Sequence, residues 1–99
     1  MIVYAVVSDL MDRSRLAAAV PGLRFARTAG ECADGDVIVV DLTRGTELVA
    51  ALRGAAPGAR IVAYGPHVDA DGLAAARAAG ADTAVPRSRF FRDIPAAIA

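Results

Sequence analysis

Short apolar runs alternate with alanine-rich segments along this chain. The runs rich in branched residues predict β-strands at residues 2–7, 37–40, 60–64 and 83–85, with a weaker candidate at 23–26. Between them, apolar residues at helical spacing predict helices at residues 12–20, 46–56 and 70–79. Strands that alternate with helices form right-handed βαβ units, so this order predicts an α/β fold with a mostly parallel sheet.

Two segments depart from this alternation. Residues 28–35 separate two predicted strands but are too few for a parallel crossover, which takes about a dozen residues. The second helix of the fold is therefore expected to be missing or reduced to a turn. Residues 88–99 form the last predicted helix, in which Pro95 is expected to introduce a bend or to end the first turn.

Composition limits the classes of function. The 99 residues suffice for one domain, which we expect to span 1–99. Eleven basic and eleven acidic side chains give a net charge of zero, so no broad field attracts nucleic acid or an anionic membrane. Cys32 is the only cysteine, which excludes an internal disulfide. With no secretory leader and no run of ~20 apolar residues, the sequence predicts a cytoplasmic protein that does not enter the membrane.

Asp41 stands where the apolar run 37–40 gives way to a polar turn. In an open parallel sheet this place is the carboxyl end of a strand, the edge at which α/β proteins bind ligands. Asp9 follows the first predicted strand in the same way. Two interpretations of Asp41 remain open: a reactive or metal-binding carboxylate, or a carboxylate that pairs with Arg87 or caps a turn.

These residues give the chain a resemblance to the receiver domain of bacterial two-component response regulators. The resemblance covers nearly the whole chain and rests on four segments: Val7-Ser8-Asp9, residues 36–42, Gly80-Ala81-Asp82 and Pro86-Arg87-Ser88. It implies a flavodoxin-like three-layer sandwich, an α/β fold with five parallel strands in the order 2-1-3-4-5.

The resemblance also implies roles for single residues. Asp41 resembles the aspartate that accepts a phosphoryl group from a histidine kinase. Asp9 and Asp41 resemble the carboxylates that hold Mg²⁺ in receivers, and Gly65 and Arg87 occupy the positions that bind the phosphoryl group.

Several positions depart from the receiver pattern. Ser8 replaces the first acid, Gly65 the hydroxyl residue, Arg87 the lysine and Ala84 a switching aromatic residue. We therefore expect a stand-alone pseudo-receiver, a signalling domain that is not an enzyme and acts through protein–protein interaction. The first alternative is a working phosphoacceptor, phosphorylated on Asp41 by a histidine kinase in the presence of Mg²⁺. The second is a small ligand-binding or enzymatic domain that uses the same edge of the sheet.

Phe90 and Phe91 are candidates for a partner surface. Adjacent residues on a helix point about 100° apart, so we expect one of the two rings to be exposed. Exposed apolar patches often mark protein contacts, and the resemblance indicates the same region as a dimer or partner face. A second copy of this chain is one expected partner, as a homodimer.

Two other patterns carry less information. His67, Asp69 and Asp71 are spaced so that they could hold a divalent cation, but the spacing belongs to no strong motif and an aspartate here also suits a helix cap. The glycines form neither a dinucleotide fingerprint nor a phosphate loop, so the sequence gives no support for nucleotide binding.

Overall fold

The computed structural model describes residues 1–66 and 69–99. The strands are β1 (Val3–Val6), β2 (Arg24–Phe25), β3 (Val37–Asp41), β4 (Arg60–Gly65) and β5 (Thr83–Pro86). The α-helices are α1 (Leu10–Ala19), α2 (Glu47–Ala55), α3 (Ala70–Ala79), α4 (Arg87–Arg92) and α5 (Ile94–Ile98). Two short 3₁₀ helices complete the described elements, η1 (Gly30–Cys32) and η2 (Leu42–Arg44).

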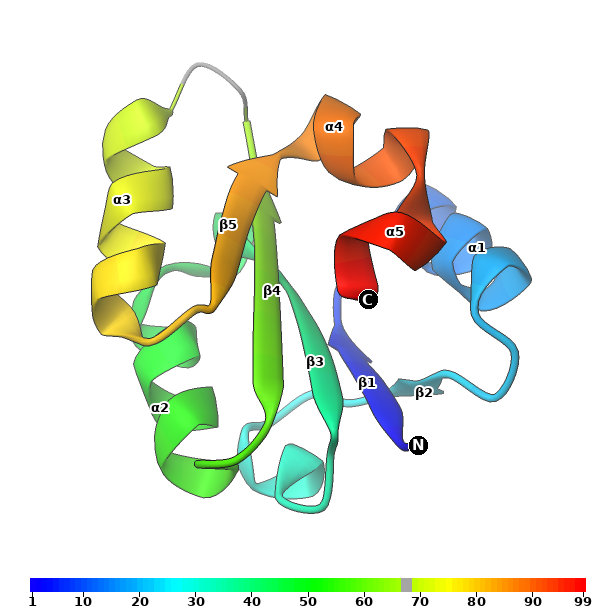
Figure 1. Ribbon diagram of the computed structural model, residues 1–99, viewed down its shortest axis with the longest axis horizontal. Helices are drawn as coiled ribbons and strands as arrows, with labels where there is room; N and C mark the ends of the chain where they lie inside the picture. The colour runs from blue at the N-terminus through cyan, green and yellow to red at the C-terminus, as the bar shows by residue number, and fades with distance from the viewer. Residues whose placement is uncertain (67–68) are drawn as a thin grey trace.

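The strands form one parallel sheet in the order β2-β1-β3-β4-β5 (Figure 1). The predicted fold class and strand order are therefore confirmed. All five strands run in the same direction, so the carboxyl ends of β1, β3, β4 and β5 meet at one edge. The weak candidate at 23–26 is also a strand, but β2 is only two residues long and pairs with β1 alone.

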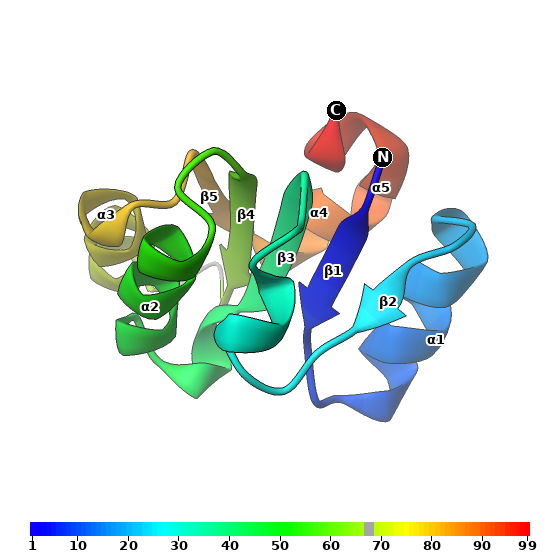
Figure 2. The ribbon, with the colours of Figure 1, turned by 90° about the horizontal axis from the view of Figure 1, so that it is seen from below.

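Successive residues of the central strands alternate between two apolar cores, one on each face of the sheet. Val6, Ile38 and Ile61 belong to the core beneath α2 and α3. Val39 and Val62 belong to the other core, which packs against α1, α4 and α5. Figure 2 shows the helices on the two sides of the sheet. Helices cover both faces of the sheet. This explains why the strand sequences are continuous apolar runs and do not alternate between apolar and polar residues.

The shortened second crossover is confirmed. The single turn η1 replaces a helix between β2 and β3, and Cys32 within it is fully buried. Glu31 stabilises the approach to this turn because its carboxylate accepts hydrogen bonds from the backbone nitrogens of Arg27 and Thr28, at 2.6 and 2.8 Å. Burial raises the pKa of the Cys32 thiol to about 11, which makes it an unreactive core side chain at neutral pH.

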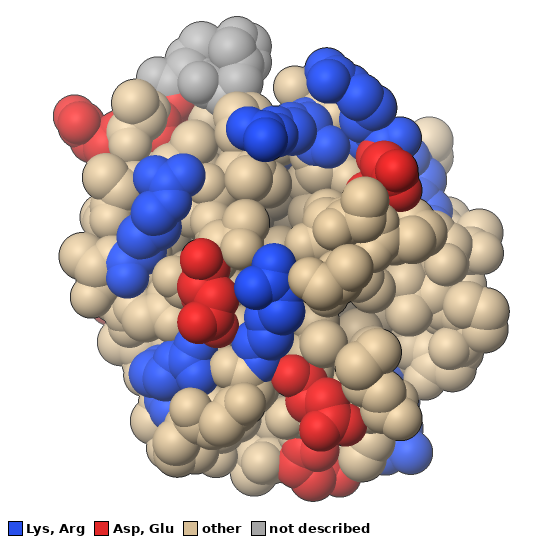
Figure 3. Space-filling model, viewed as in Figure 1, with Lys and Arg blue, Asp and Glu red and all other residues tan. Residues whose placement is uncertain are grey.

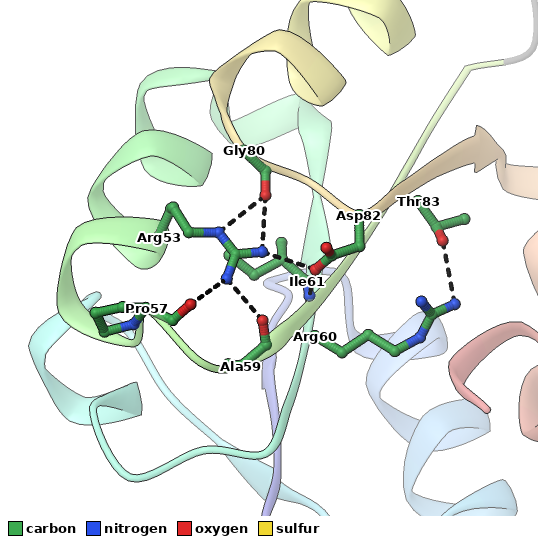
Figure 4. Close-up of polar contacts among 8 residues, drawn as sticks. All are labelled: Arg53, Pro57, Ala59, Arg60, Ile61, Gly80, Asp82 and Thr83. Carbon is green, nitrogen blue, oxygen red and sulfur yellow. Dashed lines mark hydrogen bonds and ion pairs between the residues drawn. The ribbon is translucent and has the colours of Figure 1, made fainter.

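The amino ends of β4 and β5 are joined by one arginine (Figure 4). Arg53 of α2 donates to the carbonyl oxygens of Pro57, Ala59 and Gly80, and forms an ion pair with Asp82 at 2.7 Å. Asp82 also accepts from the backbone nitrogen of Ile61, at 2.8 Å. The Ile61 contact, followed by the ion pair, holds the pKa of Asp82 below its usual value.

The last predicted helix is two short helices rather than one. The chain leaves helical geometry at Asp93, whose φ is −152° and ψ is 85°. Proline lacks an N–H donor and is suited to the first turn of a helix, so Pro95 lies in the first turn of α5 and does not continue α4. The carboxylate of Asp93 caps the new helix by accepting from the nitrogen of Ala96, at 3.2 Å.

None of the helices in the described residues has both the length and the apolar composition needed to cross a membrane.

Candidate functional site

An open cleft of about 430 Å³ lies at the carboxyl edge of the sheet. Its lining comes from the ends of four strands and the turns after them: Ser8, Asp9, Asp12, Asp41, Thr43, Tyr64, Gly65, Pro66 and Arg87. The topology thus brings together Asp9, Asp41, Gly65 and Arg87, which the sequence analysis selected as one site. It also adds residues that were not predicted as part of the site, of which Asp12 and Tyr64 make the main side-chain contacts.

Asp41 ends β3 and is 5 % exposed. Its side chain accepts a hydrogen bond from the backbone nitrogen of Thr43, at 3.0 Å, and so caps the short helix η2. Of the two structural roles that the sequence left open for Asp41, the structure shows the turn cap. It does not show the ion pair with Arg87, because that guanidinium binds a different carboxylate.

Asp9 is exposed and begins α1. Its side chain accepts from the backbone nitrogen of Asp12, at 3.0 Å, which is the usual contact of a helix N-cap. Both aspartates that resemble the acidic residues of receivers therefore have a local structural role. Ser8, beside Asp9, brings no charge to the cleft.

Arg87 forms an ion pair with Asp12, which lines the same cleft as Asp41. Both terminal nitrogens of the guanidinium donate to the two carboxylate oxygens of Asp12, the bidentate geometry that arginine forms with carboxylates. Asp12 is completely buried, whereas the Arg87 side chain remains 44 % exposed. This pair connects the first turn of α1 to the start of α4.

The hydroxyl of Tyr64 also donates a hydrogen bond to the Asp12 carboxylate, at 2.8 Å. Arg87, and after it Tyr64, keep the pKa of Asp12 below its usual value in spite of burial. Burial and the bond to Asp12 raise the pKa of Tyr64, and the same carboxylate raises the pKa of Arg87. The three side chains therefore keep Asp12 and Arg87 charged and mutually neutralised.

Asp12 could have been found from the sequence. It lies four residues before Leu16 and eight before Val20, on the face of α1 that the apolar spacing predicts to be buried. A carboxylate on such a face needs a cationic partner, because an unpaired buried charge is costly. What the sequence does not contain is which arginine supplies that charge.

Gly65 ends β4, where receivers carry a hydroxyl. It is buried, and a Cβ atom built on it would lie 3.3 Å from side-chain atoms of Leu42. A serine or threonine at this position would therefore require Leu42 to shift. Position 65 therefore brings no hydroxyl to the cleft, and Leu42 occupies part of the space that a larger residue there would use.

The three carboxylates of the cleft already have contacts within the fold. Asp12 is paired with Arg87, and Asp9 and Asp41 each accept one backbone hydrogen bond at a helix end. No group of three or more His, Cys, Asp or Glu side chains gathers as a metal site among the described residues. The guanidinium of Arg87 adds a fixed positive charge to the same cleft.

The expected exposed patch at Phe90 and Phe91 is wrong, because both side chains are buried. Phe90 stacks on Tyr64 with ring centroids 4.8 Å apart, and Phe91 meets Tyr64 edge to face. Arginine side chains cover the other side of Phe91, with the guanidinium of Arg15 4.3 Å and that of Arg87 4.8 Å from the ring centroid. The spacing within residues 88–99 could not show this, because Tyr64 lies in β4, Arg15 lies in α1 and Arg87 precedes that segment.

The weaker metal candidate includes His67, which lies outside the described residues. Asp69 has the alternative role that the sequence allowed, since its side chain accepts from the nitrogen of Gly72, at 2.9 Å, and caps α3. Asp71 lies in the first turn of the same helix.

A parallel sheet of order 2-1-3-4-5 is the flavodoxin-like arrangement. No protein-family model matches the chain, and no curated protein matches it. Solved structures do. The chain is similar to a response regulator from Burkholderia pseudomallei with a phosphorylated aspartic acid, a calcium ion and citrate: the TM-score is 0.79 at 24 % identity, over 100 % of this chain and 67 % of that one.

Two further structures have the same fold. One is the signal receiver domain of a DNA-binding response regulator from Colwellia psychrerythraea, with a TM-score of 0.70 at 17 % identity, over 97 % of each chain. The other is a response regulator from Thermotoga maritima, with a TM-score of 0.71 at 19 % identity, over 87 % of this chain and 83 % of that one. At such identities the likeness shows that this chain has the receiver fold.

Proposed function

We propose that this chain is a pseudo-receiver, which acts through contact with a partner protein and does not depend on phosphorylation of Asp41. The observation that carries the proposal is the bidentate pair of Arg87 with the buried Asp12. In receivers the cation at this position is the one that binds the phosphoryl group. Here it already has an anionic partner within the fold.

Electrostatics supports this proposal. A phosphoryl group on Asp41 would bring a charge of about −1.5 to −2 into the cleft. To bind it with both terminal nitrogens, Arg87 would have to give up its bidentate contact with Asp12, and a buried carboxylate that loses its cation is destabilised. Asp12 also keeps its bond from Tyr64, which adds to the stability of the existing arrangement.

The other differences from receivers act in the same direction. Gly65 offers no hydroxyl to follow a phosphoryl group, and Ala84 gives no bulky side chain to move. The three carboxylates of the cleft already have contacts within the fold, so we expect Mg²⁺ to screen the charge of an incoming phosphodonor weakly. What remains is a fixed α/β scaffold whose surfaces can bind a partner.

The test is treatment with acetyl phosphate and Mg²⁺, followed by intact-mass analysis. We expect no gain of about 80 Da, the mass of one phosphoryl group, in the wild-type chain. A variant with the receiver residues restored, Ser8→Asp, Gly65→Thr and Arg87→Lys, serves as the comparison, with circular dichroism to confirm that it is folded.

A gain in the wild-type chain that disappears in Asp41→Asn would contradict the proposal. It would favour the working phosphoacceptor, for which the position of Asp41 in an open cleft is the supporting observation. A gain in the restored variant alone would identify the three substitutions as the reason for the loss.

A further inference from the structure

A second concave region lies away from the cleft, between β5 and the two C-terminal helices. It has a volume of about 370 Å³, and three of the residues that line it are arginines: Arg60, Arg89 and Arg92. Figure 3 shows blue side chains around a hollow on this face, with tan atoms between them. We call this region the arginine groove.

The arginines of the groove are poorly neutralised. Among the described residues none of the three forms an ion pair, because the two ion pairs of the structure involve Arg53 and Arg87. Asp93 is the acidic residue in the lining, and its carboxylate caps α5. Asp82, whose pKa Arg60 helps to lower, is bound to Arg53 and to the backbone of β4.

Arg60 has more donors than acceptors. A guanidinium carries five N–H donors, and within the described part of the chain its side chain has one hydrogen-bond acceptor, the hydroxyl of Thr83 at 3.1 Å (Figure 4). Its Nε atom is buried and has no acceptor among those residues. The terminal nitrogens carry further N–H donors beside the bond to Thr83, so a carboxylate seated against them would add hydrogen bonds to this guanidinium.

The groove also has an apolar component. Val85 and Ala97, both partly buried, contribute to its lining. Cations beside an apolar surface suit a protein segment in which acidic and apolar side chains alternate. A nucleic acid is disfavoured, because the chain as a whole has no net charge and so supplies no extended positive field.

We propose that the arginine groove binds an acidic, partly apolar segment of a partner protein. This inference rests on the proposed function, since it names the partner chemistry of a domain that acts by contact. It does not rest on the state of Asp41, because the groove lies outside the cleft and shares no lining residue with it.

The test uses the full chain and a fluorescein-labelled peptide in which leucines separate glutamates, with a glutamine-for-glutamate peptide as control. We expect the acidic peptide to shift the ¹⁵N–¹H resonances of Thr83, Arg89 and Ala96, and the control peptide not to do so. In fluorescence titrations, the double variant Arg89→Gln and Arg92→Gln is expected to weaken binding about tenfold, the effect of losing charge-assisted hydrogen bonds. Arg27→Gln, an exposed arginine outside the groove, should leave the affinity unchanged.

Three results would overturn the inference: no resonance shift, equal binding of the glutamine peptide, or equal binding by the double arginine variant. Tighter binding of a single-stranded oligonucleotide through the same arginines would also overturn it, in favour of a polyanion site. Failure of the proposed function is read separately, from acetyl phosphate labelling. If the chain is phosphorylated and still binds the peptide, the groove proposal stands and the pseudo-receiver proposal fails. If the chain is not phosphorylated and does not bind the peptide, only the groove proposal fails.

Discussion

Arg87 pairs with Asp12 and not with Asp41, the partner that the sequence left open. Asp41 and Asp12 both line the cleft, yet the guanidinium binds Asp12, the more deeply buried of the two. Burial favours this choice, because the carboxylate that has lost more of its hydration gains more from a cation. Asp41 in turn satisfies a backbone nitrogen of η2.

Replacement of Asp12 by asparagine tests the energy of this pair. The variant Asp12→Asn keeps the shape of the side chain but removes its charge, so we expect the free energy of unfolding at pH 7 to fall by about 1–3 kcal/mol. The value lies below that of a fully buried pair because Arg87 is half-exposed. Urea unfolding measures it, and Asp71→Asn, an exposed residue of α3, should change stability by no more than about 0.5 kcal/mol.

The ion pair of Asp12 with Arg87 also predicts how the difference in stability between wild type and Asp12→Asn depends on pH. In the folded chain the pKa of Asp12 lies below its ordinary value of 3.8, so near that pH the unfolded chain binds more protons. The contribution of the pair is complete above pH 3.8 and is lost as the pH falls through the lower, folded pKa. Wild type and Asp12→Asn should therefore converge in stability under acidic conditions. If the difference in unfolding free energy between wild type and Asp12→Asn stayed constant as the pH fell below 3.8, the ion pair would be contradicted.

Single residues differ in how far the sequence reveals their role. Asp41 and Asp9 were predictable at the carboxyl edge because each follows an apolar run, and the edge is a property of the topology. Asp12 carries a weaker signal, an acid on an apolar helix face. Its pairing with Arg87, 75 residues further along the chain, depends on the folded arrangement of α1 and α4 and is not contained in any local pattern.

At the scale of elements, the strands followed from the sequence because both faces of the sheet are buried. Continuous runs of branched residues, such as residues 37–40, are typical of this environment. The C-terminal region was less predictable. Helical spacing over 88–99 indicated one helix with one exposed ring, but Asp93 and Pro95 divide it, and α4 lies so that aromatic and arginine side chains enclose Phe91.

Gly80 ends α3 before β5 and lies against Arg53 of α2, so substitutions at Gly80 probe the contact between these elements. Its φ of +123° is unfavourable for any side chain, and a Cβ atom there would lie 3.0 Å from the Cβ and Cγ atoms of Arg53. We therefore expect Gly80→Ala to lower the free energy of unfolding by about 1–3 kcal/mol. Thermal and urea unfolding would measure the change.

The matched control is Gly54→Ala in α2. No atom lies within 4 Å of a Cβ built on Gly54, and alanine is the better helix former, so this variant should gain about 0.5–1 kcal/mol. Equal effects at both positions would show that Gly80 is not constrained by its backbone or by Arg53.

At the scale of the whole molecule, the chain has the receiver fold. The sheet has the receiver strand order, Asp41 ends β3 at its carboxyl edge, and Asp12 of α1 and Arg87 of α4 line the same cleft as an ion pair. The arginine groove lies on another part of the surface, beside β5 (Figure 3). The proposed function and the proposed groove together predict a molecule whose binding face is not altered by events in the cleft.

The most direct test of this claim is the ¹⁵N–¹H spectrum of the whole chain before and after addition of Mg²⁺ and beryllofluoride, a non-covalent mimic of an aspartyl phosphate. The account predicts that the resonances of Thr83, Arg89 and Ala96 in the arginine groove do not move. Saturable shifts that begin at Asp41 and extend to these three residues would contradict it, because they would show that the cleft accepts a phosphoryl group and transmits its presence to the binding face.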